Sequence, residues 1–327
     1  MDWGRWDAGS TWENNPMKLR YLLAATAAIT ALTASAAFAA EPESCKEPHF
    51  ADVTWTDNTA QNGLLNTVLK GLGYKSKIDV LTLPIILESL KAKQLDFFLD
   101  NWMPSNASNV QPYFDEKSID MIKVDLKGAA YGPAVPDYVA EAGVKDLKDL
   151  GKFGDKFENK FYGIEPGNDG NKIVQAKIDD PANGLKGWEL VESSEQGMLS
   201  QVEKAIPKKE WVVFLHWVPH PVMADMKVVY LTGFGGEGGF GDSTVQAISR
   251  PGYTTECPNI GKLLTNVEFT VPMESEVMKA ILAGKDGDTA GTDWLKANPQ
   301  VLDAWLAGVT TVDGTEGLPA VKASLGL

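Results

Sequence analysis

Segments typical of β-strands alternate with segments typical of α-helices in two separate stretches, and this alternation constrains the fold most. The first stretch predicts strands and helices in the order 49–55, 57–73, 78–81, 84–93 and 95–99. The second predicts strands at 160–164, 189–191, 211–215 and 227–231, with helices after Asn171 and over 194–205. The latter helix is expected to start with a capping box of Ser193 and Gln196. Because such units form parallel βαβ layers and 327 residues are too many for one compact core, we expect two α/β lobes.

The N-terminal region has the pattern of a secretory signal. A basic start at 17–20 precedes an apolar run over 21–31, and Ala37-Phe38-Ala39 provides the small residues that a signal peptidase reads. The apolar run is too short for a transmembrane helix. We therefore expect cleavage after Ala39 and a periplasmic mature protein, with residues 1–16 as extra sequence ahead of the signal.

The mature chain contains two cysteines, Cys45 and Cys257. In an exported protein an isolated pair predicts one disulfide, with two buried free thiols as the alternative. A bridge would return the chain to the first lobe before the tail, where helices are expected at 274–282, 292–297, 299–307 and 319–325. The two parallel-rich sheets would then be joined by a hinge of two crossings, near 127–133 and 232–251. This assigns 1–39 to the leader, 40–130 and 250–327 to lobe 1, and 131–249 to lobe 2.

Composition excludes several classes of partner. The formal net charge of −14 argues against nucleic acid and against anionic membrane surfaces. The three histidines, His49, His216 and His220, lack the cysteine partners and the spacing of a zinc site. We expect no metal and no cofactor.

Tryptophans follow predicted strands in both lobes. Trp55 and Trp102 follow strands of lobe 1, and Trp217 follows a strand of lobe 2. Ligands of open α/β sheets bind beyond the carboxyl ends of strands, so these residues would meet across a cleft. Facing aromatic rings suit a trimethylammonium group, which offers no hydrogen-bond donor. The alternatives are a place in the core for each tryptophan, and the N-cap of the next helix for Asp57.

The polar residues near these tryptophans bear on the class of ligand. No lysine or arginine occurs in the segments 54–57, 99–104, 164–169 and 215–219, which disfavours phosphate and simple carboxylate ligands. A glycosidase would also line its cleft with tryptophans, and Asp57 with Glu165 is the only reasonable carboxylate pair for one. A sugar-binding protein would need more polar side chains than these segments offer. The residues favour a binding protein over an enzyme.

Five segments together resemble one known family. They are Trp55-Thr56-Asp57, Asn101-Trp102-Met103-Pro104, and the stretches 165–171, 192–198 and 252–258. In these segments the chain is similar to the periplasmic choline-binding proteins of ABC transporters, over nearly the whole mature sequence. The resemblance implies the two-lobed type II binding-protein fold and a monomer that delivers choline to an ABC permease in the inner membrane. It also implies an aromatic box of Trp55, Trp102, Tyr131 and Trp217, with Asp57 and Asn168 holding the ligand's hydroxyl.

The chain departs from this family near the expected site. The stretch Asn58-Thr59-Ala60-Gln61-Asn62-Gly63 follows Asp57 where the family usually has small and β-branched residues, and His216 and Asp100 are larger than the residues usual at their positions. Gln61, Asn101 and His216 are therefore further candidates for ligand contact. These donors leave the ammonium box intact, but they make carnitine a competitor of choline, with glycine betaine as another alternative.

Overall fold

The computed structural model describes residues 41–235 and 239–327, so the predicted signal sequence lies outside the described residues. Its strands form one nine-stranded mixed sheet in the order β2-β1-β3-β9-β4-β7-β5-β6, with β8 paired to β4. The strands are β1 (His49–Asp52), β2 (Lys77–Val80), β3 (Phe97–Met103), β4 (Asp120–Pro136), β5 (Lys160–Tyr162), β6 (Glu189–Val191), β7 (Phe214–Val218), β8 (Val228–Tyr230) and β9 (Gly241–Ser249).

Helices connect and cover these strands. They are α1 (Thr56–Gly71), α2 (Leu83–Lys91), α3 (Ala107–Asp115), α4 (Asp137–Glu141), α5 (Leu147–Leu150), α6 (Asp169–Asp179), α7 (Glu195–Ala205), α8 (Pro221–Ala224), α9 (Tyr253–Glu256), α10 (Pro258–Asn266), α11 (Val271–Leu282), α12 (Gly287–Ala297), α13 (Val301–Trp305) and α14 (Gly317–Leu325). Short 3-10 helices lie at Glu43–Cys45, Gly151–Phe157, Pro181–Asn183 and Ile206–Lys208.

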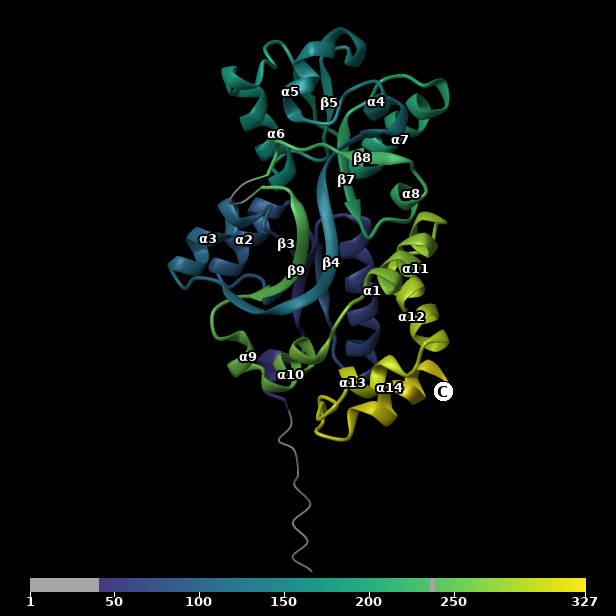
Figure 1. Cartoon of the computed structure of the whole chain (residues 1–327). Helices are drawn as coiled ribbons and strands as arrows, with labels where there is room; N and C mark the ends of the chain where they lie inside the picture. Colours follow the sequence, from purple (N-terminus) through teal and green to yellow (C-terminus); the bar gives the residue numbers. More distant parts are fainter. Residues whose placement is uncertain (1–40, 236–238) are drawn as a thin grey trace, which may run out of the picture. The chain divides into compact units, whose positions relative to one another are not determined.

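Parallel pairing occurs in two groups of strands. In lobe 1, β1 lies between β2 and β3, and in lobe 2, β5 lies between β6 and β7. The long strands β4 and β9 pair with each other antiparallel and connect the two groups (Figure 1). The two expected parallel-rich sheets are therefore two regions of one continuous sheet, because both crossings are themselves strands that hydrogen-bond to each other.

The C-terminal helices return to lobe 1 and pack on α1. Helix α1 contacts α11, α12 and α14. Its approach to α12 depends on glycine, because a Cβ on Gly63 would overlap the backbone of Gly287, and a Cβ on Gly291 would overlap that of Gly63. Side chains at these positions would force the two helices apart.

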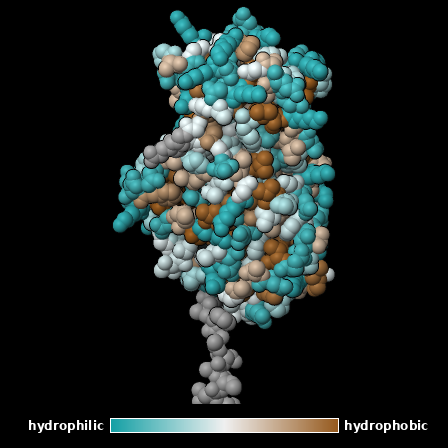
Figure 2. Space-filling view, viewed as in Figure 1, coloured by the Kyte–Doolittle hydropathy of each residue, from teal (hydrophilic) through white to brown (hydrophobic). Residues whose placement is uncertain are grey.

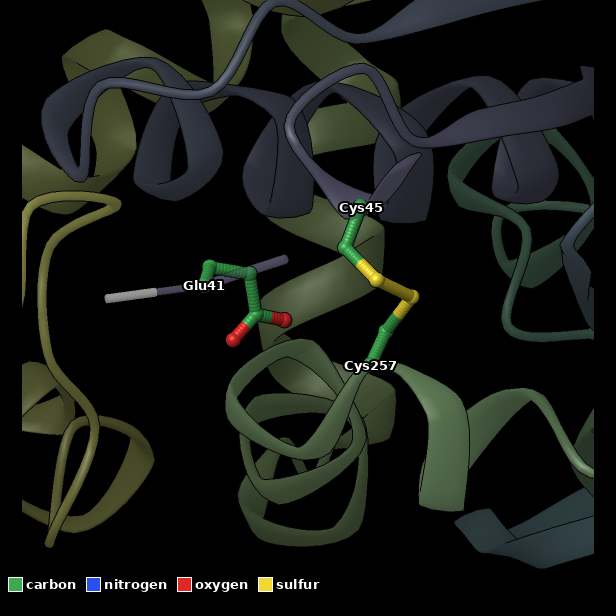
Figure 3. Close-up of side chains that lie close together, drawn as sticks. All are labelled: Glu41, Cys45 and Cys257. Carbon is green, nitrogen blue, oxygen red and sulfur yellow. A yellow bond between two sulfur atoms is a disulfide. The ribbon is translucent and has the colours of Figure 1, made fainter. Parts of the chain in front are cut away.

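The disulfide joins the start of lobe 1 to the returning chain. Cys45 and Cys257 are bonded, with their Cα atoms 5.6 Å apart, and the Glu41 carboxylate lies beside them (Figure 3). Glu41 accepts hydrogen bonds from the backbone N–H groups of Asn259 and Ile260 in the first turn of α10. The predicted bridge is confirmed, and its sulfurs are unavailable as thiolate ligands for a metal.

Two local predictions are wrong. The N-cap of α7 is Ser194, whose hydroxyl accepts the backbone N–H of Gly197 at 3.1 Å. Since the third helical residue is then a glycine, it has no side chain to complete a capping box. Strands β3 and β7 also continue through Trp102 and Trp217, because β9 and β4 pair with them there.

The surface is mainly hydrophilic on the face shown in Figure 2, with hydrophobic residues scattered among polar ones. In the described part of the chain, no helix combines the length and the apolar character that a membrane span requires.

Candidate ligand-binding site

A small cavity lies where the two lobes meet. Its lining consists of four aromatic residues, two acidic residues and one isoleucine: Trp55, Trp102, Tyr131, Trp217, Asp57, Asp169 and Ile164. Trp55 and Asp57 stand at the start of α1, Trp102 on β3, Tyr131 on the crossing strand β4 and Trp217 on β7. Elements that are far apart in sequence therefore each contribute residues to the cavity lining.

The aromatic rings present faces and edges to one space. The Tyr131 ring lies between two tryptophans, with its centroid 5.8 Å from that of Trp102 and 6.2 Å from that of Trp217. Its plane is inclined at 61° to the first and 87° to the second. Steeply inclined rings form the sides of a box, and the negative faces of such rings attract a cation.

Acidic side chains hold two of the tryptophans in place. The indole N–H of Trp55 donates to Glu165 Oε1 at 2.7 Å, and that of Trp102 donates to Asp100 Oδ1 at 2.9 Å. The first bond connects the lobes, because Trp55 is the N-cap of α1 and Glu165 follows β5. With their N–H groups bound in this way, both indoles are fixed in orientation.

Tyr131 depends on a glycine for its position. A Cβ on Gly170 would overlap the Tyr131 hydroxyl group. Gly170 is the second residue of α6, so the start of this helix approaches the tyrosine without any side chain between them. Only glycine leaves this space free.

Three polar atoms of the lining are buried without a partner among the described residues. They are the Tyr131 hydroxyl oxygen, Asp57 Oδ1 and Asp169 Oδ2. A buried polar atom without a partner is costly, which makes these atoms available to a ligand. When ionised, the two carboxylates can only accept hydrogen bonds, so the cavity is suited to a cation that carries a donor.

Burial and mutual repulsion alter the ionisation of these acids. Burial, with repulsion from Glu195, raises the pKa of Asp57 to about 8. Burial raises the pKa of Glu165 to about 7, although its bond from Trp55 acts in the opposite direction. Burial also raises the pKa of Asp169. A bound cation would favour the ionised forms, whereas a bound carboxylate would oppose them.

Four of the predicted site residues lie outside the cavity lining. Asn168 is the N-cap of α6, where its side chain accepts from the Asn171 backbone at 2.8 Å and donates to the Glu165 carbonyl. Gln61 donates to Glu274 at 3.0 Å. The Asn101 side chain donates to Gln246 and accepts from Asn106.

His216 is directed away from the box. Its Nδ1 pairs with the Tyr230 hydroxyl at 2.7 Å and its Nε2 with the Met223 carbonyl at 3.2 Å. Successive side chains of a strand point to opposite faces, so the strand that aims Trp217 into the cavity turns His216 away from it.

Sequence reasoning missed Ile164 and Asp169 as lining residues. Both lie in the segment 164–169, which follows a predicted strand and was already noted for its place after that strand. The start of a helix gives adjacent residues different directions, so Asn168 caps α6 while Asp169 faces the cavity. That choice depends on helix geometry, which the segment's composition does not reveal.

The chain is similar to known transport binding proteins in sequence and in fold. Residues 49–297 match the substrate-binding domain of ABC-type glycine betaine transport systems. An ABC-transporter choline-binding protein, solved in complex with choline, is 47% identical, with a TM-score of 0.84, and the match covers 88% of this chain and 100% of that one.

Two more distant relatives are similar to this chain in fold or in sequence. Lactococcal OpuAC, in a closed conformation with glycine betaine, is 27% identical, with a TM-score of 0.71, over 80% of this chain and 99% of that one. The glycine betaine/carnitine transport binding protein of Listeria monocytogenes is 29% identical over 188 residues, which are 58% of this chain and 59% of the relative. The predicted family and the two-lobed type II fold are confirmed. The chain belongs to the substrate-binding domains of ABC-type glycine betaine transport systems, a family of extracytoplasmic transport binding proteins.

Proposed function

We propose that this protein captures choline and delivers it to an ABC permease in the inner membrane. The observation that carries the proposal is the box of Trp55, Trp102, Tyr131 and Trp217, which is closed by carboxyl groups rather than by cationic side chains. The 47% identical relative solved with choline supports the same ligand.

The aromatic box supplies a large part of the required affinity. A cation over one ring is stabilised by ~0.5–2 kcal/mol, so four rings give roughly 2–8 kcal/mol. Micromolar binding corresponds to about 8 kcal/mol. The trimethylammonium group therefore provides the affinity in this proposal, and the polar atoms provide the selectivity.

The acidic lining favours choline over its carboxylated relatives. The hydroxyl of choline donates to Asp57 in this proposal, and Asp169 adds a second negative group to the cavity. Asn168 contributes indirectly, by capping α6 and so placing Asp169. Glycine betaine and carnitine bring a carboxylate close to both acids, where like charges repel.

The proposed function also implies how the chain is divided into lobes and where the protein acts. We assign residues 40–130 and 250–327 to lobe 1 and 131–249 to lobe 2, with β4 and β9 as the hinge. The protein acts as a periplasmic monomer after its signal sequence is removed. We assign the protein a transport role rather than a catalytic one, because its family consists of transport binding proteins.

Calorimetric titration with choline, acetylcholine, carnitine and glycine betaine tests the proposal. Choline should bind most tightly, and the recovered ligand should be chemically unchanged. Tighter binding of glycine betaine than of choline would overturn the choice of ligand. Conversion of any of the four ligands would overturn the assignment as a binding protein.

A further inference from the structure

A buried carboxylate joins the two lobes beside the cavity. Glu195, the first residue of α7 in lobe 2, is 1% exposed. Its Oε2 accepts the backbone N–H of Thr56 at 2.9 Å, and its Oε1 accepts the Thr56 hydroxyl. Thr56 is the first residue of α1 in lobe 1 and is itself buried.

A histidine of lobe 2 completes this group. His220 is the N-cap of α8, and its Nδ1 accepts the backbone N–H of Met223 at 3.3 Å. In the neutral ring the proton must then be on Nε2, which lies 3.1 Å from Glu195 Oε1. The Glu195 carboxyl group thus receives three hydrogen-bond donors, two from lobe 1 and one from lobe 2, which satisfies its polar oxygens in a buried position.

Thr56 and His220, the two hydrogen-bond partners of Glu195, each lie next to residues of the box. Thr56 lies between Trp55 and Asp57 in the sequence, so its position fixes the start of α1 from which both project. The ring of His220 packs edge-on against Trp217, with centroids 5.3 Å apart. Glu195 does not line the cavity, yet it is bonded to a neighbour of each opposing wall.

We propose that Glu195 is a positioning residue that locks the lobes together over a bound quaternary-ammonium ligand. Its bonds to Thr56 exist only when the lobes are in contact, whereas its bond to His220 lies within lobe 2. Removing the two hydrogen bonds from Thr56 to Glu195 therefore weakens the closed state without affecting either lobe alone. The inference rests on the proposed binding function and adds a residue that controls how long the ligand stays.

Two variants with matched controls separate closure from stability. Thr56→Val removes only the hydroxyl that crosses between the lobes, and Glu195→Gln removes the charge that all three donors share. Thr67→Val, on the same helix, removes a hydroxyl that bonds to the Gly63 carbonyl within lobe 1. Glu192→Gln removes a carboxylate that accepts from Asn171 within lobe 2.

The readouts are choline affinity, choline dissociation rate and the distance between the lobes. Hydrogen bonds to a charged group justify an increase in Kd of about tenfold for Thr56→Val and about 100-fold for Glu195→Gln. The increase should appear as faster dissociation, with the ratio of choline to acetylcholine affinity unchanged. Electron–electron distance measurements between spin labels on the exposed residues Asp115 and Ala176 should need more choline to reach the closed distance.

The controls should lower the melting temperature without changing Kd, whereas Thr56→Val should leave the ligand-free melting temperature unchanged. Choline Kd values within twofold of the unmodified protein in both test variants would overturn the lock while leaving choline binding intact. If glycine betaine or carnitine closes the protein and choline does not, the proposal that choline is the ligand is wrong. The role of Glu195 is then tested with the ligand that does close the protein. If none of the three produces a closed distance, the lock is refuted as well.

Discussion

Tyr131 contributes both a ring face and a free hydroxyl to the cavity, and its place depends on the absence of a side chain at Gly170. We predict that Gly170→Ala pushes the tyrosine ring out of its position and raises the choline Kd at least tenfold, because a Cβ at this site would overlap the phenol oxygen. Calorimetry measures the change. Adding Tyr131→Phe removes the overlapping oxygen and should recover part of the affinity. A double variant that is no better than Gly170→Ala would contradict this explanation.

The tryptophans of the box should matter for binding much more than for folding. Replacing Trp102 or Trp217 with alanine removes one face of the box, and we expect choline affinity to fall at least tenfold while circular dichroism still shows a folded protein. Trp211→Ala is the matched control, since Trp211 packs on Phe153 and Phe157 away from the cavity. It should lower stability and leave affinity unchanged. Unchanged affinity in both Trp102→Ala and Trp217→Ala would exclude the aromatic box.

At the residue scale the sequence predicts the box better than the polar contacts. All four predicted aromatic residues line the cavity. The three tryptophans were predicted from their places near strand ends, and Tyr131 from the resemblance to the family. The predicted amides and His216 lie elsewhere, because a polar side chain near a site can equally cap a helix or bond to a neighbouring strand. Asp57 is the polar prediction that does line the cavity.

Among the elements, the regular βαβ segments were predictable and the hinge strands were not. Strand β6 was predicted to the residue, and α1 to within two residues at either end. Strand β4 was expected only as a crossing. Its pairing with β9 shifts register at three places, so apolar residues do not alternate along it. A β-bulge breaks the period of two by which a strand is recognised in a sequence.

The disulfide fastens the end of the second crossing to the start of lobe 1. We predict that thiol titration of the denatured, unreduced protein detects no free thiol. The double variant Cys45→Ser, Cys257→Ser should lose about 2–4 kcal/mol of unfolding free energy, because the bridge closes a loop across 212 residues of sequence. Urea unfolding measures the loss. Choline affinity should change little, since both cysteines lie away from the cavity lining. Two titratable thiols in the unmodified protein would contradict the bridge.

Across the whole molecule, acidic side chains are concentrated inside as well as on the surface. Asp57, Asp100, Asp125 and Glu274 are all buried, and burial raises the pKa of each. Asp100 and Glu274 are further raised by the charge of Asp57, and both are also affected by Asp125. Within the described residues each of the four has at least one oxygen without a hydrogen-bond partner. Folding therefore favours the protonated forms of these groups relative to the unfolded chain.

This proton storage should make stability and binding respond to pH in opposite directions. The pKa of Asp125 is raised from 3.8 in its ordinary state to about 8, so between these values the folded state binds a proton that the unfolded state does not. The free energy of unfolding of the ligand-free protein should accordingly fall as pH rises from 5 to 8. Asp125→Asn should flatten this decline and raise the melting temperature at pH 8, as scanning calorimetry will measure. Equal destabilisation of Asp125→Asn at pH 5 and pH 8 would contradict a stored proton at this position.

Binding of choline should follow the opposite trend because a cation favours ionised Asp57. With a pKa of about 8 in the free protein, Asp57 is mostly protonated at pH 6, and the arriving trimethylammonium group lowers that pKa. Choline binding therefore releases a proton, and its association constant rises with pH until about pH 8, by up to about tenfold per unit for one proton. Titrations in two buffers of different ionisation enthalpy will count the released protons. Asp57→Asn should lower the number of protons released, while Asp125→Asn, which lies outside the cavity lining, should leave that number unchanged. An affinity that stays constant from pH 6 to 8 would show that Asp57 is already ionised before choline arrives.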